Sequence, residues 1–295
     1  MTSYPLLITG GNGQLGGAIG RVARAQGIVC EMPGRSDLDL ADPASIHRFM
    51  RDRKWRAIVN CAAYTAVDKA ESEPHLAEAI NAAAPGFLAE YAASQGIGIY
   101  QVSTDYVFDG TKSAPYAETD PVAPLGVYGR SKAAGEDAVR RAAPDHHAII
   151  RTAWVLSATG TNFLNTMLRL AAERDDIGVV ADQFGCPTSA DDLAQILLAL
   201  VERGAATGGT WHAVNQGVAS WHELALHIFE RAEAAGLPVP QVRAITTADY
   251  PTPARRPKNS RLSTRLLHND FGLTLRPWQE AVDALLRERL TKQEN

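Results

Sequence analysis

The stretch TGGNGQLG at residues 9–16 decides the fold, because it joins a strand-like run to a helical run through regularly spaced glycines. The run before it, residues 4–9, is largely apolar and favours a strand. A strand-to-helix turn of this kind lets the backbone approach a pyrophosphate and directs helix N-terminal amides at its charge. Glycines also occur in plain tight turns, but their place before the first helix of an alternating chain favours a dinucleotide site at Gly10, Gly13 and Gly16.

Strand-like and helical runs alternate along the first half of the chain, in the rhythm of a parallel sheet covered by helices on both faces. The strand-like runs are 4–9, 28–32, 57–63, 98–102 and 147–155, and the helical runs are 14–26, 43–52, 76–94 and 128–142. The strand-like runs are almost continuously apolar, as buried parallel strands are. We therefore predict an α/β fold built on a Rossmann-type doubly wound parallel sheet.

The pattern becomes more mixed after the last of these strands. Further helical runs lie at 163–173, 190–203, 221–235 and 278–290. The loop 248–260 carries three prolines and three cationic residues. We predict a dinucleotide-binding domain over 1–156, to which segments near 188–216 return. A smaller C-terminal substrate-binding domain is predicted over 157–187 and 217–295.

Composition and charge exclude several kinds of partner. The 295 residues are 45% hydrophobic and 21% charged, which is typical of a globular protein. The net charge of -4 argues against binding nucleic acid or an anionic membrane surface. We read no secretory signal and no apolar run of the roughly 20 residues that span a bilayer, so we expect a cytoplasmic protein. The odd number and wide spacing of Cys30, Cys61 and Cys186 predict small buried hydrophobes and not a metal or redox site.

The end of the second strand bears on the choice of cofactor. An acidic residue there binds the ribose hydroxyls of NAD, whereas a cation accepts the additional phosphate of NADP. Arg35 and Ser36 favour NADPH, but Asp37 follows them directly and NADH stays possible. A solvated loop charge is an equally good interpretation of Arg35.

Three side chains predict carbonyl chemistry near the glycine loop. Thr104 lies at the end of the fourth buried strand, where ligands bind in open α/β sheets, and its hydroxyl is suited to orienting a carbonyl. Tyr128 and Lys132 are four residues apart and so share one face of the next helix. We expect Tyr128 to donate a proton and the Lys132 ammonium to lower the pKa of the phenol. Chance spacing would explain the Tyr-Lys pair alone, but not its combination with the glycine loop and Thr104.

Together these features resemble the extended short-chain dehydrogenase/reductase superfamily. Longer strings resemble one family within it, the dTDP-4-dehydrorhamnose reductases. They are NCAAYTAVDKAESEP (60–74), VSTDYVFDGT (102–111), YAETDPVAPLGVYGRSKAAGE (116–136), RTAWVL (151–156), NFLNTMLRLAAER (162–174), DQFGCPT (182–188) and YPTPARRPKNSRL (250–262). The resemblance extends over most of the chain and is less distinctive near its C-terminal end.

The resemblance implies an activity and a division of roles. The family reduces the 4-keto group of dTDP-4-dehydro-6-deoxy-L-mannose with NADPH or NADH and forms dTDP-L-rhamnose, the last step of dTDP-rhamnose synthesis. Its fold is a Rossmann domain with a small sugar-nucleotide-binding domain. By matching strings, Tyr128 is the implied proton donor, Lys132 its partner and Thr104 the hydrogen-bonding group for the carbonyl.

The same resemblance implies further contacts to the cofactor and the substrate. Gly13, Gln14 and Leu15 would line the pyrophosphate, Asp39 and Leu40 would approach the adenosine half, and Ala63, Tyr64 and Thr65 would border the cofactor. Asp105 and Trp154 would contact the sugar, and Arg256 and Asn259 the nucleotide end. Trp154 has an alternative interpretation as a core aromatic residue.

The residues after the glycine loop bear on whether a metal ion bridges two subunits. Some members of the family form Mg²⁺-bridged dimers through a carboxylate shortly after the glycine loop, but residues 16–20 read GGAIG. We therefore expect no bridging metal, and a homodimer stays possible.

Other functions occur on the same fold. A related branch is a non-catalytic NADP-binding regulatory subunit of a methionine adenosyltransferase. The intact Thr104, Tyr128 and Lys132 argue against this alternative. Nucleotide-sugar epimerases, dehydratases and other 4-keto reductases are further alternatives, although Tyr106 stands where a dehydratase needs Glu.

Overall fold

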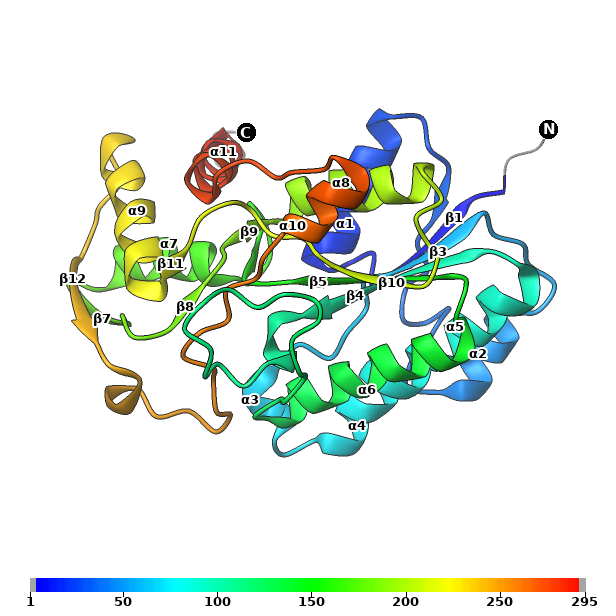
Figure 1. The fold of residues 1–295 in the computed structure, drawn as a ribbon. Helices are drawn as coiled ribbons and strands as arrows, with labels where there is room; N and C mark the ends of the chain where they lie inside the picture. Colours follow the sequence, from blue (N-terminus) through cyan, green and yellow to red (C-terminus); the bar gives the residue numbers. More distant parts are fainter. Residues whose placement is uncertain (1–3, 292–295) are drawn as a thin grey trace.

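A six-stranded parallel sheet forms the centre of the structure, a computed structural model that describes residues 4–291 (Figure 1). Its strands are β1 (Leu6–Thr9), β2 (Cys30–Glu31), β3 (Ala57–Asn60), β4 (Gly98–Thr104), β5 (His147–Thr152) and β10 (Gly209–His212). They follow the order β10-β5-β4-β3-β1-β2, and every pairing is parallel. The chain order reverses between β1 and β3, so a crevice is expected at their carboxyl ends. The predicted fold class is confirmed.

Helices cover both faces of this sheet (Figure 1). One face carries α1 (Gln14–Ala25), α8 (Ala190–Glu202) and α10 (Arg265–Phe271), and the other carries α2 (Pro43–Met50), α5 (Ala84–Gln95) and α6 (Val127–Ala142). Successive residues of β1 point to opposite faces, so Leu6 and Ile8 join one apolar cluster and Leu7 joins the other. Both faces are therefore buried, which explains the continuous apolar runs.

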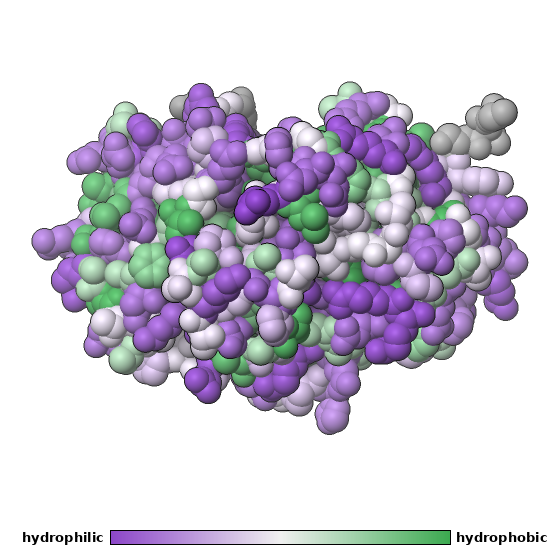
Figure 2. Space-filling view, in the orientation of Figure 1, coloured by the Kyte–Doolittle hydropathy of each residue, from purple (hydrophilic) through white to green (hydrophobic). Residues whose placement is uncertain are grey.

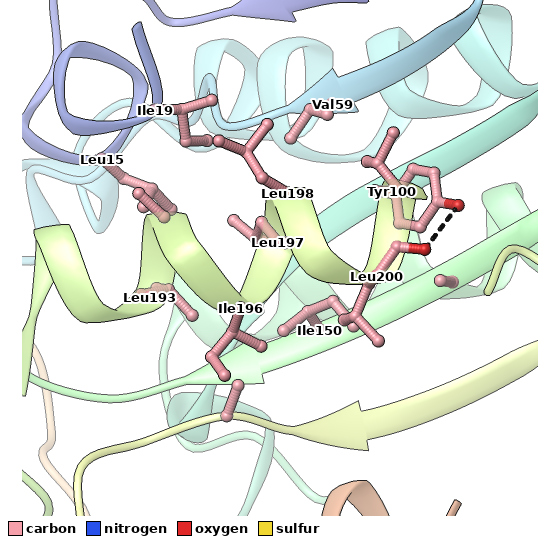
Figure 3. Packing of buried hydrophobic residues seen from close by; sticks show 14 of the residues in the cluster. Leu15, Ile19, Val59, Tyr100, Ile150, Leu193, Ile196, Leu197, Leu198 and Leu200 are labelled. Carbon is pink, nitrogen blue, oxygen red and sulfur yellow. Dashed lines mark hydrogen bonds between the residues drawn. The ribbon is translucent and has the colours of Figure 1, made fainter. Parts of the chain in front are cut away.

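Helix α8 shows how the first of these clusters is packed (Figure 3). Leu193 and Leu197 are fully buried against the sheet and α1. The Tyr100 phenol, also buried, donates a hydrogen bond to the Leu200 carbonyl oxygen at 3.2 Å. This contact joins the C-terminal half of α8 to β4, because a buried polar group requires a partner.

Three predicted elements differ from those observed. The expected helix over 76–94 consists of α4 (Pro74–Glu78), a π-helical segment (Ala79–Ala83) and α5. The second strand is shorter than expected. The expected strand over 147–155 is interrupted because Trp154 has a φ of 47°, in the left-handed region, and only a short strand β6 (Val155–Leu156) follows.

The rest of the chain packs around a separate apolar cluster, drawn at the left of Figure 1. Its helices are α7 (Phe163–Glu173), α9 (Trp221–Ala234) and α11 (Trp278–Thr291), with the short strands β7 (Asp176–Val180), β8 (Phe184–Gly185), β9 (Thr188–Ser189), β11 (Ala219–Ser220) and β12 (Gln241–Ile245). The chain returns to the central sheet at α8 and β10 between these pieces. The predicted division into two domains, with its stated boundaries, stays a prediction.

The distribution of hydrophobic residues on the surface and the burial of the cysteines can be compared with the expectations from the sequence. On the face seen in Figure 2, hydrophobic residues form small groups among hydrophilic ones. None of the helices within residues 4–291 has the length and apolar character needed to cross a membrane. The cysteines are free: Cys186 is buried as predicted, whereas Cys30 and Cys61 are only half-buried.

The N-terminus of helix α2 is capped by a side chain, and removal of this cap should have a modest effect on stability. Asp42 accepts a hydrogen bond from the Ala44 amide at 2.9 Å, and Pro43 occupies the first helical position. Asp42→Ala is expected to lower the free energy of unfolding by about 1 kcal/mol, whereas Asp42→Asn should keep most of it. Urea denaturation of the three proteins measures this, and equal stability of Asp42→Ala and wild type would contradict the assigned cap.

Candidate active site

The glycine loop between β1 and α1 forms a cradle that side chains would fill. A Cβ at Gly16 would lie 2.2 Å from the Gly10 carbonyl oxygen. Gly10 itself has a φ of 70°, and a Cβ there would lie 2.8 Å from the Ala62 backbone. Gly13 precedes α1, whose N-terminus has no side-chain cap and no acidic residue in its first turn. The first amides of α1 therefore have no cap, which suits an incoming pyrophosphate.

A cavity of about 580 Å³ opens over this loop, where the switch in strand order predicts a ligand site. Fifteen of the residues singled out from the sequence line it: Gly10, Gly13, Gln14, Leu15, Gly16, Arg35, Asp39, Leu40, Ala63, Thr65, Thr104, Asp105, Tyr128, Lys132 and Trp154. The cavity therefore brings the glycine loop and the three predicted chemical groups together. The individual roles of these residues stay predictions.

Tyr64, Arg256 and Asn259 do not line the cavity. The Tyr64 phenol donates to Glu73 at 2.6 Å, and the Arg256 guanidinium donates to Asp68 at 2.8 Å. The Asn259 amide donates to the Ala114 carbonyl at 3.0 Å and holds its own loop in place. Sequence reasoning grouped these three with the ligand contacts, but in this structure they bind other parts of the protein.

Other cavity-lining residues were not singled out as site residues from the sequence. They are Thr9, Gly11, Asn12, Pro33, Leu38, Cys61, Ala62, Ile80, Val102, Ser103, Thr152, Ala153 and Val155. For Cys61 and Ala62 a signal was present, because both directly precede the predicted cofactor residue Ala63. Ile80 lies in the π-helical segment, and no local pattern indicates that this turn faces a ligand.

Arg35 lines the cavity together with Asp39 and Leu40. Its guanidinium is exposed and lies 3.4 Å from the Asp39 carboxylate. A surface ion pair of this kind contributes little, so Arg35 is available to a phosphate at small cost. Asp37, the residue that favours NADH, is exposed and does not line the cavity.

Thr104, Tyr128 and Lys132 come from two elements that meet at the base of the cavity. Thr104 is the last residue of β4, and Tyr128 and Lys132 occupy successive turns of α6. The Thr104 hydroxyl donates to Asp105 at 2.9 Å and lines the cavity near the Tyr128 phenol. The Lys132 ammonium is buried and donates to the Val102 carbonyl at 2.7 Å.

The pKa of the Tyr128 phenol departs from the sequence expectation. Burial raises the pKa to about 12, in spite of the opposing effect of the nearby Thr104 hydroxyl. The predicted lowering by Lys132 is not seen, since its ammonium is directed to the Val102 carbonyl. Burial also lowers the pKa of Lys132 to about 8, against the opposing charges of Glu136 and Cys61. At neutral pH the phenol is therefore protonated and the amine is mostly charged.

Asp105 is a buried carboxyl group at the same place. One of its oxygens accepts from Thr104, and the other has no hydrogen-bond partner within the described chain. Burial raises its pKa to about 6. The unpartnered oxygen in a cavity-lining residue could accept a hydrogen bond from a ligand hydroxyl.

Asp105 predicts a specific pH dependence of stability. Its pKa rises from 3.8 in the unfolded chain to about 6 in the folded protein. The contribution of the protonated carboxyl to the free energy of unfolding is therefore complete below pH 3.8 and is lost as the pH rises through 6. Asp105→Asn cannot ionise and so does not lose this contribution. As the pH rises from about 4 to about 7, the free energy of unfolding of the variant should therefore increase relative to that of wild type by roughly 3 kcal/mol, at about 1.4 kcal/mol per pKa unit. Urea denaturation at both pH values tests it, and a constant difference would contradict the buried, protonated carboxyl.

Trp154 is both a packed residue and a cavity-lining one. Its indole stacks on Trp221 with ring centroids 3.4 Å apart, and a Cβ at Gly185 would lie 2.4 Å from it. Its φ of 47° is unusual for a bulky residue and requires support from these neighbours. Packing and ligand contact are therefore compatible at this residue.

No group of three or more metal-ligating side chains occurs within the described residues 4–291. The cradle, the crevice at the switch point and the Thr104, Tyr128 and Lys132 groups define the class of protein. It is a Rossmann-type, nicotinamide-dependent oxidoreductase of the short-chain dehydrogenase/reductase kind.

Comparison with known proteins identifies the family. The model of the RmlD substrate binding domain matches residues 4–291. Curated dTDP-4-dehydrorhamnose reductases from Sinorhizobium fredii and Escherichia coli are 45% and 41% identical, over 95% and 97% of this chain and 96% and 98% of their own. The chain belongs to the dTDP-4-dehydrorhamnose reductase family.

Solved structures agree with this assignment. A dTDP-4-dehydrorhamnose reductase from Clostridium acetobutylicum superposes with a TM-score of 0.91 at 38% identity, covering 96% of this chain and 99% of that one. The Bacillus anthracis reductase, solved in complex with NADP, has a TM-score of 0.90 at 34% identity and covers 97% and 100%.

Proposed function

We propose that this enzyme reduces the 4-keto group of dTDP-4-dehydro-6-deoxy-L-mannose with NADPH and forms dTDP-L-rhamnose, the last step of dTDP-rhamnose synthesis. One observation carries the proposal: a single cavity joins the uncapped N-terminus of α1 to Thr104, Tyr128 and Lys132. Family membership adds the substrate. NADH is a second possible reductant.

The nicotinamide supplies the hydride when NADPH is bound, and the protein must supply one proton and hold the carbonyl. Tyr128 is protonated at neutral pH and is suited to donating its phenolic proton to the carbonyl oxygen. Thr104, which lines the same cavity, is suited to holding the same oxygen. A donor aimed at the oxygen stabilises the negative charge that develops there.

Lys132 has an electrostatic role in this scheme. Its ammonium lies on the same face of α6 as Tyr128 and is mostly charged below its pKa of about 8. After proton donation the phenolate is a buried anion, and a cation in the same cavity stabilises it. Lys132 therefore makes the transfer less costly, although it does not lower the pKa of the resting phenol.

Substrate contacts complete the proposal. Asp105 offers its unpartnered oxygen to a sugar hydroxyl, and Trp154 offers an apolar surface. Arg256, held by Asp68 in this structure, would bind the substrate diphosphate after a small rearrangement of its loop. The enzyme would work in the cytoplasm on a small-molecule sugar nucleotide.

Nicotinamide absorbance tests the function. Wild type is mixed with NADPH and dTDP-4-keto-6-deoxyglucose in the presence of its 3,5-epimerase, and with the corresponding UDP-sugar as a control. Loss of absorbance that requires the epimerase and the dTDP-sugar supports the proposal. Tight NADPH binding without any oxidation would favour a non-catalytic regulatory subunit.

A further inference from the structure

The helix that carries Tyr128 begins without a cap of its own. Gly126 is its N-cap residue and has no side chain to bond the first amides. The Val127 amide instead donates to Glu71 at 2.8 Å, a residue 56 positions earlier in the chain. Tyr128 directly follows Val127. A distant carboxylate therefore binds the backbone next to the proposed proton donor, at the positive end of the helix dipole.

Glycine at position 126 is explained by this contact. The backbone there is extended, with a φ of -122° and a ψ of 174°, which any residue adopts. A Cβ would nevertheless lie 2.6 Å from the nearer Glu71 oxygen, and the nearest atom outside Glu71 is the Arg255 oxygen at 3.9 Å. A side chain at this position would therefore displace the Glu71 carboxylate and nothing else.

The first turn of α6 has little freedom on its other sides. A Cβ at Gly129 would lie 2.2 Å from the Tyr106 carbonyl oxygen, so α6 packs directly on the backbone that follows Thr104. Tyr106 and Tyr128 also make an edge-to-face ring contact at 5.8 Å. Small shifts at the start of α6 will therefore change the relation of Tyr128 to Thr104.

Glu71 is itself held in a structured segment. It follows the short helix α3 (Val67–Ala70), in which Asp68 accepts from Arg256 at 2.8 Å and from the Ala254 amide at 3.2 Å. The segment thus binds the start of the α6 helix and the Pro-rich loop at the same time. It is anchored well enough to define where α6 begins.

We propose that Glu71 is a positioning residue for Tyr128, acting through the amide of Val127, and that Gly126 is required to admit its carboxylate. This inference rests on the proposed reductase function. Glu71 touches neither substrate nor cofactor, since it does not line the cavity. Its removal should therefore affect turnover more than the binding of either ligand.

Four variants test this role: Glu71→Ala, Glu71→Gln, Gly126→Ala and the Glu71→Ala/Gly126→Ala double variant. We expect Glu71→Ala to lower kcat by about tenfold or more, because displacement of a reacting group by a fraction of an ångström is costly, with KM for NADPH within about twofold. Glu71→Gln should recover most of kcat, because its amide oxygen still accepts from Val127. Gly126→Ala should reproduce the loss, and the double variant should be no worse than Glu71→Ala.

Asp42→Ala is the matched control, because it removes a carboxylate from the start of a helix that does not carry Tyr128. It should lose stability with an unchanged kcat at saturating NADPH. Wild-type kcat in Glu71→Ala, additive losses in the double variant, or no recovery in Glu71→Gln would each overturn the positioning role. Absence of turnover in wild type would instead overturn the proposed function, and this inference with it.

Discussion

Tyr128→Phe is expected to bind NADPH as wild type does and to lose kcat by about 10³-fold, within the range that a positioned proton donor contributes. The phenol lines the cavity together with Thr104 and is protonated at neutral pH. Phenylalanine keeps the ring and its contact with Tyr106 but cannot donate. Steady-state assays of nicotinamide absorbance measure the loss of kcat, and fluorescence titration measures NADPH binding.

Tyr91→Phe is the control for this substitution. Tyr91 lies on α5 and does not line the cavity, and its phenol donates to the Arg53 carbonyl at 2.5 Å. It should leave kcat unchanged. If Tyr128→Phe kept more than about a tenth of wild-type kcat, a role as the proton donor would be contradicted, since general acid catalysis contributes at least about a hundredfold.

Gly16→Ala is expected to reduce NADPH affinity by about tenfold to a hundredfold, because overpacking of the turn costs of order 1–3 kcal/mol. Its Cβ would lie 2.2 Å from the Gly10 oxygen and 2.7 Å from the Gly10 carbonyl carbon, both backbone atoms that no side-chain rotation can move. The turn must open, and the amides at the start of α1 then lose their common direction.

Gly17→Ala is the neighbouring control. Its Cβ would make ordinary contacts, with the Gly11 oxygen as the nearest atom at 3.5 Å, and alanine stabilises a helix interior relative to glycine. NADPH titration and thermal unfolding of both variants separate binding from stability. A Gly16→Ala protein that binds NADPH as tightly as Gly17→Ala would contradict the assigned cradle.

Features that depend on nearby residues were predictable from the sequence. The glycine loop and the Tyr128 to Lys132 spacing are local patterns, and the structure places both at one cavity. The alternating apolar runs predicted the parallel sheet for the same reason, because each strand must bury both faces. Thr104 was placed at the end of its strand because it directly follows the strand-like run 98–102 and Ser103.

Features that depend on distant contacts were not predictable. The interruption at Trp154 requires Trp221 and the space at Gly185, neither of which its own segment reveals. The resting pKa of Tyr128 was expected to fall because a cation stands four residues away, but helix spacing does not say where the Lys132 ammonium points. The contact of Arg256 with Asp68 is also a distant one that no local pattern shows; its ligand contact, which the family resemblance implied, stays a prediction.

Identification of the product by NMR tests the central claim most directly. Wild-type enzyme is supplied with NADPH and dTDP-4-keto-6-deoxyglucose in the presence of the 3,5-epimerase, and the sugar nucleotide formed is characterised at C4. We predict dTDP-L-rhamnose in an amount equal to the NADPH consumed. The opposite configuration at C4, or unchanged substrate in the presence of bound NADPH, would contradict the proposed reaction.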